Sequence, residues 1–144
     1  MRDPDRMRVR VSLRTSEGFR SAAYQDSKGF WTIGYGRLID ARRGGGISQG
    51  EAEYMLANDV LSAEMACETM PAYLDLSPPR QAVLIEMCFN LGVDGLRKFK
   101  RMFSALVHQD YAHAAAEMLD SQWAADVKDR AVRLAEQMKT GQWQ

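Results

Sequence analysis

The sequence predicts an α+β fold that is mainly α. Short runs of aromatic and β-branched residues separated by glycine occur only near the N-terminus. A long capped stretch with helical spacing follows them, and further helical patterns continue to the C-terminus. The 144 residues suit one domain of ordinary size. We expect a small N-terminal lobe with a β-hairpin over about 12–57, joined by a long helix to a helical lobe over 70–144.

The first element is ambiguous from its residues alone. Residues 7–13 alternate apolar and polar side chains, which is typical of a strand. An aspartate at position 3 or 5 can cap a helix, however, and Gly18 stands where a helix would stop. The family resemblance described below favours a helix that ends at Glu17.

A β-hairpin is predicted next. Residues 22–26 and 30–35 form two short strand patterns, and Ser27, Lys28 and Gly29 connect them. Gly34 and Gly36 interrupt the second pattern, which indicates a bend or a close approach of other atoms to the backbone. We interpret residues 42–46 as a loop and expect a third, edge strand at Ile47.

Helices are predicted for the rest of the chain. The letters S-Q-G-E at 48–51 fit a capping box, and the apolar spacing continues toward Pro71. Pro78 and Pro79 suit the first turn of the next helix, which Gly92 closes. Three further amphipathic helices are predicted over 96–107, 111–119 and 126–138.

Composition excludes several classes of protein. Apolar residues make up 46% and charged residues 26%, a balance typical of a globular protein rather than a disordered one. Nineteen basic and nineteen acidic residues give no bulk charge to attract nucleic acid, although arginines concentrate in the first twenty residues, where we expect a solvated helix face. Cys67 and Cys88 are expected to be buried free thiols. No apolar run approaches membrane-spanning length or resembles the apolar core of a signal peptide, so we expect no stable membrane insertion and a cytoplasmic protein before release.

Carboxylates are the catalytic groups that remain once other chemistries are excluded. His108 and His113 would point about 140° apart on a helix, and no other histidine exists, so no metal and no cofactor are expected. No G-x-S-x-G motif occurs. Glu17, Asp26 and Thr32 offer two carboxyls and a hydroxyl, which are the groups needed to protonate a leaving oxygen and direct a water. By spacing alone, the favoured explanations are a helix end for Glu17, a turn-forming aspartate for Asp26 and an ordinary strand residue for Thr32.

The full wording of the motif is more specific. Residues 17–36 contain the letters E-G-F-R, A-Y, D, G and W-T-I-G-Y-G in an order that resembles the signature of the phage T4-type lysozymes, the muramidases of glycoside hydrolase family 24. The similarity continues through A-N-D-V at 57–60, F-N-L-G-V at 89–93, and S-Q-W, D-R-A-V-R and T-G-Q-W near the C-terminus. It therefore covers nearly the whole chain.

The resemblance implies a lysozyme-like fold, with glycan bound in a cleft between the lobes and the N-terminal helix packed on the C-terminal lobe. The positions that match the family's site are Glu17, Asp26, Thr32, Gly36, Phe89, Asn90 and Arg130. Glu17 is similar to the general acid, Asp26 to the carboxylate that steers water, and Thr32 to the hydroxyl that holds it. Arg130 resembles an arginine that orients the glutamate, while Phe89, Asn90 and Gly36 match substrate-binding positions.

These roles carry physical requirements. Glu17 must keep its proton, so its surroundings should be partly desolvated, whereas Asp26 must stay ionised and should be more solvated. Arg37 stands where the family commonly has histidine, and we expect it to form an ion pair with Asp59.

The resemblance thus predicts a monomeric muramidase that cleaves the β-1,4 bond between N-acetylmuramic acid and N-acetylglucosamine in peptidoglycan, as a phage-type endolysin without a nucleic-acid partner. Two alternatives remain at this point. One is a catalytically silent binding or scaffold module with the same fold. The other is a chitinase or a lytic transglycosylase.

Overall fold

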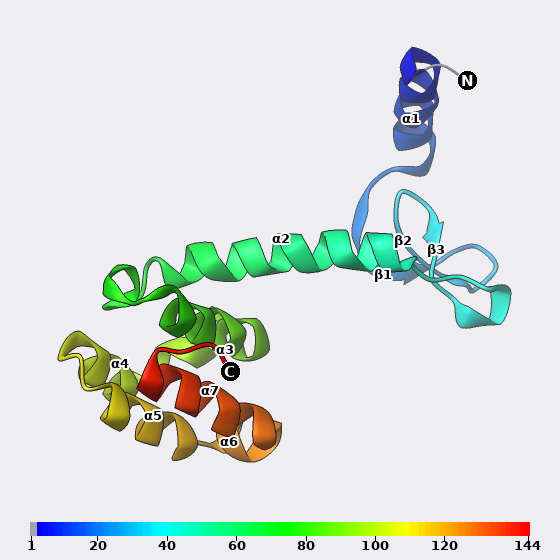
Figure 1. Cartoon of the computed structure of the whole chain (residues 1–144). Helices are drawn as coiled ribbons and strands as arrows, with labels where there is room; N and C mark the ends of the chain where they lie inside the picture. Colours follow the sequence, from blue (N-terminus) through cyan, green and yellow to red (C-terminus); the bar gives the residue numbers. More distant parts are fainter. Residues whose placement is uncertain (1–2) are drawn as a thin grey trace. The chain divides into compact units, whose positions relative to one another are not determined.

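A computed structural model describes residues 3–144 and confirms the α+β, mainly α, fold (Figure 1). The chain divides into two compact units. The N-terminal unit extends to Glu53, and the C-terminal unit comprises Tyr54–Gln144. The boundary lies within the long helix α2 (Gln49–Cys67). The predicted packing of the first helix on the C-terminal lobe stays a prediction.

The N-terminal unit begins with helix α1 (Asp3–Glu17), whose end is the predicted one. Three strands follow, namely β1 (Arg20–Gln25), β2 (Trp31–Gly34) and β3 (Arg37–Leu38), and then a short 3-10 helix, η1 (Ala41–Arg43). The strands form one antiparallel sheet in the order β1-β2-β3, so β2 is its central strand.

The third strand differs from the prediction. It comprises Arg37 and Leu38, whereas Ile47 lies outside the sheet. Gly34 and Gly36 have φ values of 67° and 74°, a left-handed conformation that glycine adopts without steric cost. These two residues turn the chain back at once, and Arg37 therefore pairs with Ile33 immediately after the turn.

Helix α2 begins with the predicted capping box. The Glu51 carboxylate accepts hydrogen bonds from the backbone N–H of Ser48 at 2.7 Å and from its hydroxyl at 2.8 Å. The backbone N–H of Glu51 in turn donates to Ser48 Oγ at 3.3 Å. These reciprocal bonds satisfy donors that a helix N-terminus would otherwise leave unpaired.

The C-terminal unit continues from α2 into a short 3-10 helix, η2 (Tyr73–Asp75), and five α-helices. These are α3 (Pro78–Arg97), α4 (Lys100–Val107), α5 (Tyr111–Leu119), α6 (Gln122–Val127) and α7 (Asp129–Thr140). The bounds of α5 are the predicted ones.

Three predicted helix boundaries are wrong. The helix predicted over 96–107 begins at Lys100, because α3 continues to Arg97. Gly92 was expected to close a helix, but the helical path resumes after a kink at this residue, where φ is 70° and ψ is 169°, and continues to Arg97. The helix predicted over 126–138 is two helices, because Lys128 (φ 51°, ψ −118°) separates α6 from α7. The spacing of apolar residues does not reveal a single residue whose backbone leaves the helical conformation.

The core of the C-terminal unit lies among its helices. Helix α5 packs against α4 and α7, and α7 also contacts α3 and α6. Fully buried side chains include Val83, Leu84 and Met87 on α3. Cys67 and Cys88 belong to this core as free thiols, as predicted, and burial raises the pKa of Cys67 to about 12.

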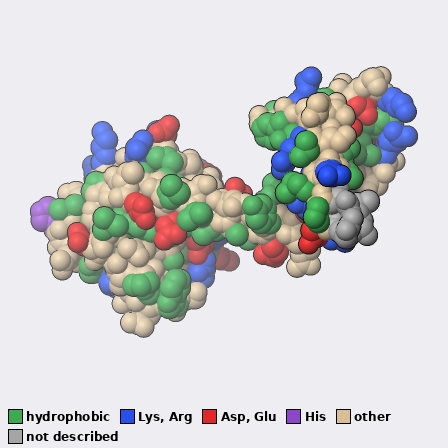
Figure 2. Space-filling model, turned by 90° about the horizontal axis from the view of Figure 1, so that it is seen from above, with side chains coloured by type: hydrophobic (Ala, Val, Ile, Leu, Met, Phe, Trp, Pro, Cys, Tyr) green, Lys and Arg blue, Asp and Glu red, His purple; other side chains and the backbone are tan. Residues whose placement is uncertain are grey.

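Charged side chains lie on the surface of each unit (Figure 2). Within the described part of the chain, none of the helices combines the length and apolar content needed to cross a membrane.

Candidate functional site

Glu17 is the last residue of α1 and lies against the turn between β2 and β3. Gly18 follows it with φ of 68° and ends the helix, as its backbone N–H bonds the carbonyl of Arg14 at 3.2 Å. A Cβ atom placed on Gly36 would come within 2.7 Å of Glu17 Oε2. The space that a side chain at Gly36 would fill is therefore occupied by the Glu17 carboxylate. The structure brings together these two predicted site residues.

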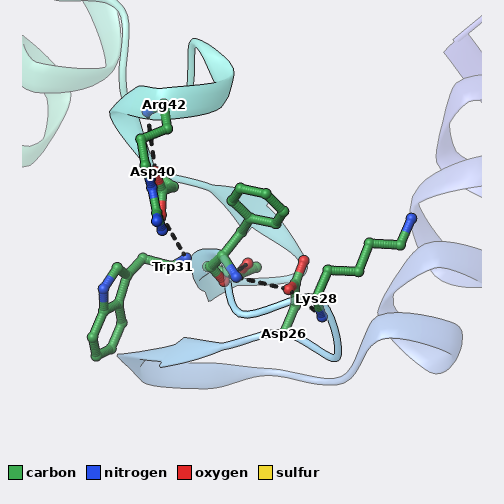
Figure 3. Close-up of polar contacts among 7 residues, drawn as sticks. Asp26, Lys28, Trp31, Asp40 and Arg42 are labelled. Carbon is green, nitrogen blue, oxygen red and sulfur yellow. Dashed lines mark hydrogen bonds and ion pairs between the residues drawn. The ribbon is translucent and has the colours of Figure 1, made fainter.

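Asp26 lies at the hairpin between β1 and β2, where its carboxylate is held by backbone donors. Oδ1 accepts from the N–H of Lys28 at 2.8 Å and from that of Phe30 at 2.9 Å (Figure 3). The hydrogen bond from Phe30 is the main reason that the pKa of Asp26 lies below its usual range, and the charges of Arg43 and Lys28 lower it further. Partial burial opposes this shift without reversing it. The predicted ionised state of Asp26 follows from these contacts.

Thr32 is buried on the central strand, next to the residues that hold Asp26. It pairs with Tyr24 on β1 and with Leu38 on β3. Its hydroxyl donates to the carbonyl of Phe30 at 3.2 Å. The backbone of Phe30 thus bonds Asp26 through its N–H and Thr32 through its carbonyl. One residue links the two predicted reacting groups.

The solvation of the two acids can be described within the N-terminal unit. There the side chain of Glu17 is exposed and that of Asp26 is half-buried, and the desolvation of Glu17 stays a prediction. Among the side chains of the N-terminal unit that the structure describes, those of Thr32 and Asp40 are the buried ones, and neither is apolar. The N-terminal unit by itself therefore lacks the apolar side chains that would desolvate Glu17.

The other predicted residues lie on α3 and α7 of the C-terminal unit. Asn90 Oδ1 accepts a hydrogen bond from Arg130 Nη1 at 3.0 Å. Phe89 precedes Asn90 and is 49% exposed. Phe89 lines a shallow hollow of about 340 Å³ that Asp59 and Gly92 also border. The structure brings Asn90 and Arg130 together, and the predicted pairing of Arg130 with Glu17 stays a prediction.

Arg37 has a different partner from the one predicted. Its Nη2 forms an ion pair with Glu51 Oε2 at 3.0 Å, and its Nε donates to the carbonyl of Gly46 at 3.0 Å. Glu51 lies in the first turn of α2, whereas Asp59 lies eight residues further along the same helix, roughly 12 Å away by helical rise. From the sequence, Glu51 is expected only in the capping box. One of its carboxylate oxygens serves both the capping box and Arg37.

Sequence reasoning missed the charged residues of the loop after β3. Asp40 is buried, and its carboxylate bonds Arg42 and the backbone N–H of Trp31 (Figure 3). The signal in the sequence is the aspartate itself, because aspartate often accepts a hydrogen bond from the backbone N–H two residues later. Asp40 Oδ1 accepts such a bond from the N–H of Arg42 at 3.0 Å. From the sequence, residues 42–46 are expected only to form a loop.

Comparison with known proteins decides the family. Residues 14–137 match the family described as phage lysozyme. The chain belongs to the phage lysozyme family. Every predicted site residue, from Glu17 to Arg130, lies within the matched range. The mainly α fold with its small sheet is accordingly a phage lysozyme fold.

Relatives of this phage lysozyme family member include proteins of different organisms. A probable T4-type lysozyme 1 of Dictyostelium discoideum is 26% identical over 92% of this chain and 94% of its own length. An endolysin of Acyrthosiphon pisum secondary endosymbiont phage 1 is 28% identical over 76% of this chain and 73% of its own. The pre-baseplate central spike protein Gp5 of Enterobacteria phage T4 is 27% identical over 96% of this chain, which matches 29% of that longer protein. The family and these names support an enzyme of the lysozyme type.

Proposed function

We propose that the chain is a muramidase that hydrolyses the β-1,4 bond between N-acetylmuramic acid and N-acetylglucosamine in bacterial peptidoglycan, as a phage-type endolysin. The observation that carries this proposal is the bonding of Phe30 to both Asp26 and Thr32, in a family member whose Glu17 carboxylate reaches Gly36 in the turn between β2 and β3. Within the N-terminal unit, these contacts supply two carboxyl groups and a hydroxyl on rigid elements. Such groups can perform acid–base hydrolysis of a glycosidic bond.

Each group has a proposed task. Glu17 gives its proton to the glycosidic oxygen as the bond breaks. Asp26, which its backbone donors keep ionised, steers the attacking water or stabilises the positive charge that develops on the sugar carbon. Thr32 helps to hold the water through a lone pair of its hydroxyl oxygen, since the hydroxyl proton is donated to Phe30.

The C-terminal unit is proposed to bind the glycan through Phe89 and Asn90. Phe89 is half-exposed and can stack on a sugar face. Arg130 fixes the amide of Asn90 through its hydrogen bond, which leaves the amide nitrogen free to donate to a sugar hydroxyl or acetyl group. The proposed substrate is therefore a glycan strand, on which the protein acts as a monomer.

The decisive experiment compares wild type with Glu17→Gln on purified peptidoglycan and analyses the reducing ends of the products. Hydrolysis releases muramic acid with a free reducing end, and Glu17→Gln should lower the rate on the order of 10²–10⁴-fold because the proton donor is lost. Glu53→Gln, which changes an exposed glutamate on α2, is the matched control and should keep full activity. An anhydro sugar would instead indicate a lytic transglycosylase. No product from a folded wild-type protein would indicate a binding or scaffold module.

A further inference from the structure

Two aspartates hold the start of β2 from opposite sides (Figure 3). Asp26 accepts from the backbone N–H of Phe30 at 2.9 Å, and Asp40 accepts from that of Trp31 at 3.4 Å. These are consecutive amides, and Thr32 follows them directly. The first aspartate belongs to the proposed reaction, whereas the second has no role in it.

Asp40 also locks the loop 39–46, which carries η1. Its side chain is 5% exposed and bonds the guanidinium of Arg42 through both carboxylate oxygens, at 2.9 Å to Nε and 2.6 Å to Nη2. The Asp40 backbone carbonyl accepts from the N–H groups of Arg43 and Gly45. A Cβ atom on Gly45 would lie 2.8 Å from Leu38 O, so the loop closes tightly on β3.

The locked loop brings two arginines to Phe30. The guanidinium carbon of Arg43 lies 4.3 Å from the centroid of the Phe30 ring, and that of Arg42 lies 5.4 Å from it. Cations at these distances are attracted by the aromatic ring. Phe30 is thus fixed by its backbone to Asp26 and by its ring to the loop.

We propose that Asp40 is a positioning residue for the N-terminal half of the site. By locking the loop, it holds the backbone that carries Asp26 and Thr32 and places Arg43 over the ring of Phe30. The inference rests on the proposed function for the roles of Asp26 and Thr32.

The arrangement has an electrostatic consequence that can be measured. The cations that act on Asp26 are Lys28, on its own hairpin turn, and Arg43, on the loop. A nearby cation favours the charged form of a carboxylate, so losing it raises the pKa. If the loop is displaced, Asp26 loses the influence of Arg43 even though Arg43 itself is unchanged.

The first experiment titrates the Asp26 carboxyl by NMR without substrate. Arg43→Gln should raise its pKa, because the charge of Arg43 is one of the causes that lower it. Arg43→Lys keeps the charge and should restore most of the shift. Arg20→Gln is the matched control, because Arg20 also stacks on an aromatic ring of the sheet, Tyr24, at 4.6 Å, and does not act on Asp26.

The second experiment tests Asp40 itself. Asp40→Asn keeps the size of the side chain but loses the ion pair with Arg42. It should raise the pKa of Asp26 in the same direction as Arg43→Gln and move the acidic limb of the kcat/KM profile on soluble peptidoglycan fragments to higher pH. We expect kcat to fall roughly threefold to tenfold with little change in KM, because the substrate still binds but Asp26 and Thr32 are displaced from the reacting atoms.

Other results would overturn the inference. A lower unfolding temperature for Asp40→Asn with an unchanged pKa of Asp26 would mean that Asp40 only stabilises the fold. An unchanged pKa in Arg43→Gln would mean that the loop does not reach Asp26. The NMR titration needs no turnover, so a failure of the proposed function, which shows as absent hydrolysis by wild type, is distinguishable from a failure of this inference.

Discussion

At Gly36 the absence of a side chain leaves room for the carboxylate of Glu17. We predict that Gly36→Ala displaces this carboxylate, since the new methyl group would lie 2.7 Å from Oε2. A shift of about 1 Å in a reacting group can cost on the order of 10²-fold in rate, and we expect a loss of this size in kcat/KM on peptidoglycan.

Gly34→Ala provides the matched control for this substitution. Gly34 has a similar positive φ, 67° against 74°, but a Cβ atom there would meet nothing within 4 Å. Both variants therefore carry the same backbone strain, about 1–2 kcal/mol, and should unfold at similar urea concentrations. Equal losses of activity in both would show that strain in the turn, and not contact with Glu17, limits the reaction.

Among single residues, those with a strong local signal were predictable. A glycine inside a strand pattern indicates a bend or a close approach of other atoms, and at Gly36 the atoms that approach are those of Glu17. The partner of Arg37 was not predictable, because Glu51 had already been assigned to a capping box and one carboxylate oxygen can accept several donors. The burial of Asp40 was equally hidden, since a loop sequence does not show which of its polar groups turn inward.

At the scale of elements, the end of α7 depends on α3. Arg80, on α3, donates from Nε to the carbonyl of Met138 at 2.8 Å and from Nη2 to that of Lys139 at 3.2 Å. The guanidinium carbon of Arg80 also lies 3.5 Å from the ring centroid of Tyr111 on α5. These bonds satisfy carbonyls that a helix C-terminus leaves unpaired, and Gly141 ends the helix with φ of 69°.

We predict that Gly141→Ala destabilises the protein. The new methyl group would lie 2.7 Å from Arg80 Nη1, and alanine tolerates this φ poorly, so we expect a loss of about 1–3 kcal/mol in the free energy of unfolding by urea. Gly50→Ala in the first turn of α2 is the control, because its Cβ atom would meet nothing and alanine favours helix. Gly50→Ala should be neutral or stabilising. Equal destabilisation by both would contradict the role given to Arg80.

Elements with complete local signals were predicted with accurate bounds. Helix α5 has Asp110 as its cap, whose carboxylate accepts from the N–H of His113 at 3.0 Å, and its bounds agreed. The break at Lys128 was missed because the apolar positions on either side keep a helical spacing. In such cases one residue with a positive φ interrupts the helix although the apolar spacing continues.

For the whole molecule, the distribution of the core predicts unequal stability. Every buried apolar side chain among the described residues lies between Ala63 and Met138, within the C-terminal unit. In the N-terminal unit, by contrast, hydrogen bonds and ion pairs such as those of Asp40 hold the loop and the sheet together. Burial of apolar surface is the dominant favourable term in folding, so local opening should cost less free energy in the sheet than in the helices.

Native-state hydrogen exchange on the intact chain tests this expectation. Amides of α3, α5 and α7 should exchange only through global unfolding of their unit, whereas amides of β1 to β3 should exchange faster, by local opening. Leu84→Ala removes a fully buried side chain and should lower the stability of the helical unit by about 2–5 kcal/mol. The slowest helical amides should then exchange correspondingly faster, with little change in the sheet. Equal acceleration in the sheet would show that both units unfold as one cooperative body, because only then does a cavity on α3 reach the hydrogen bonds of β2.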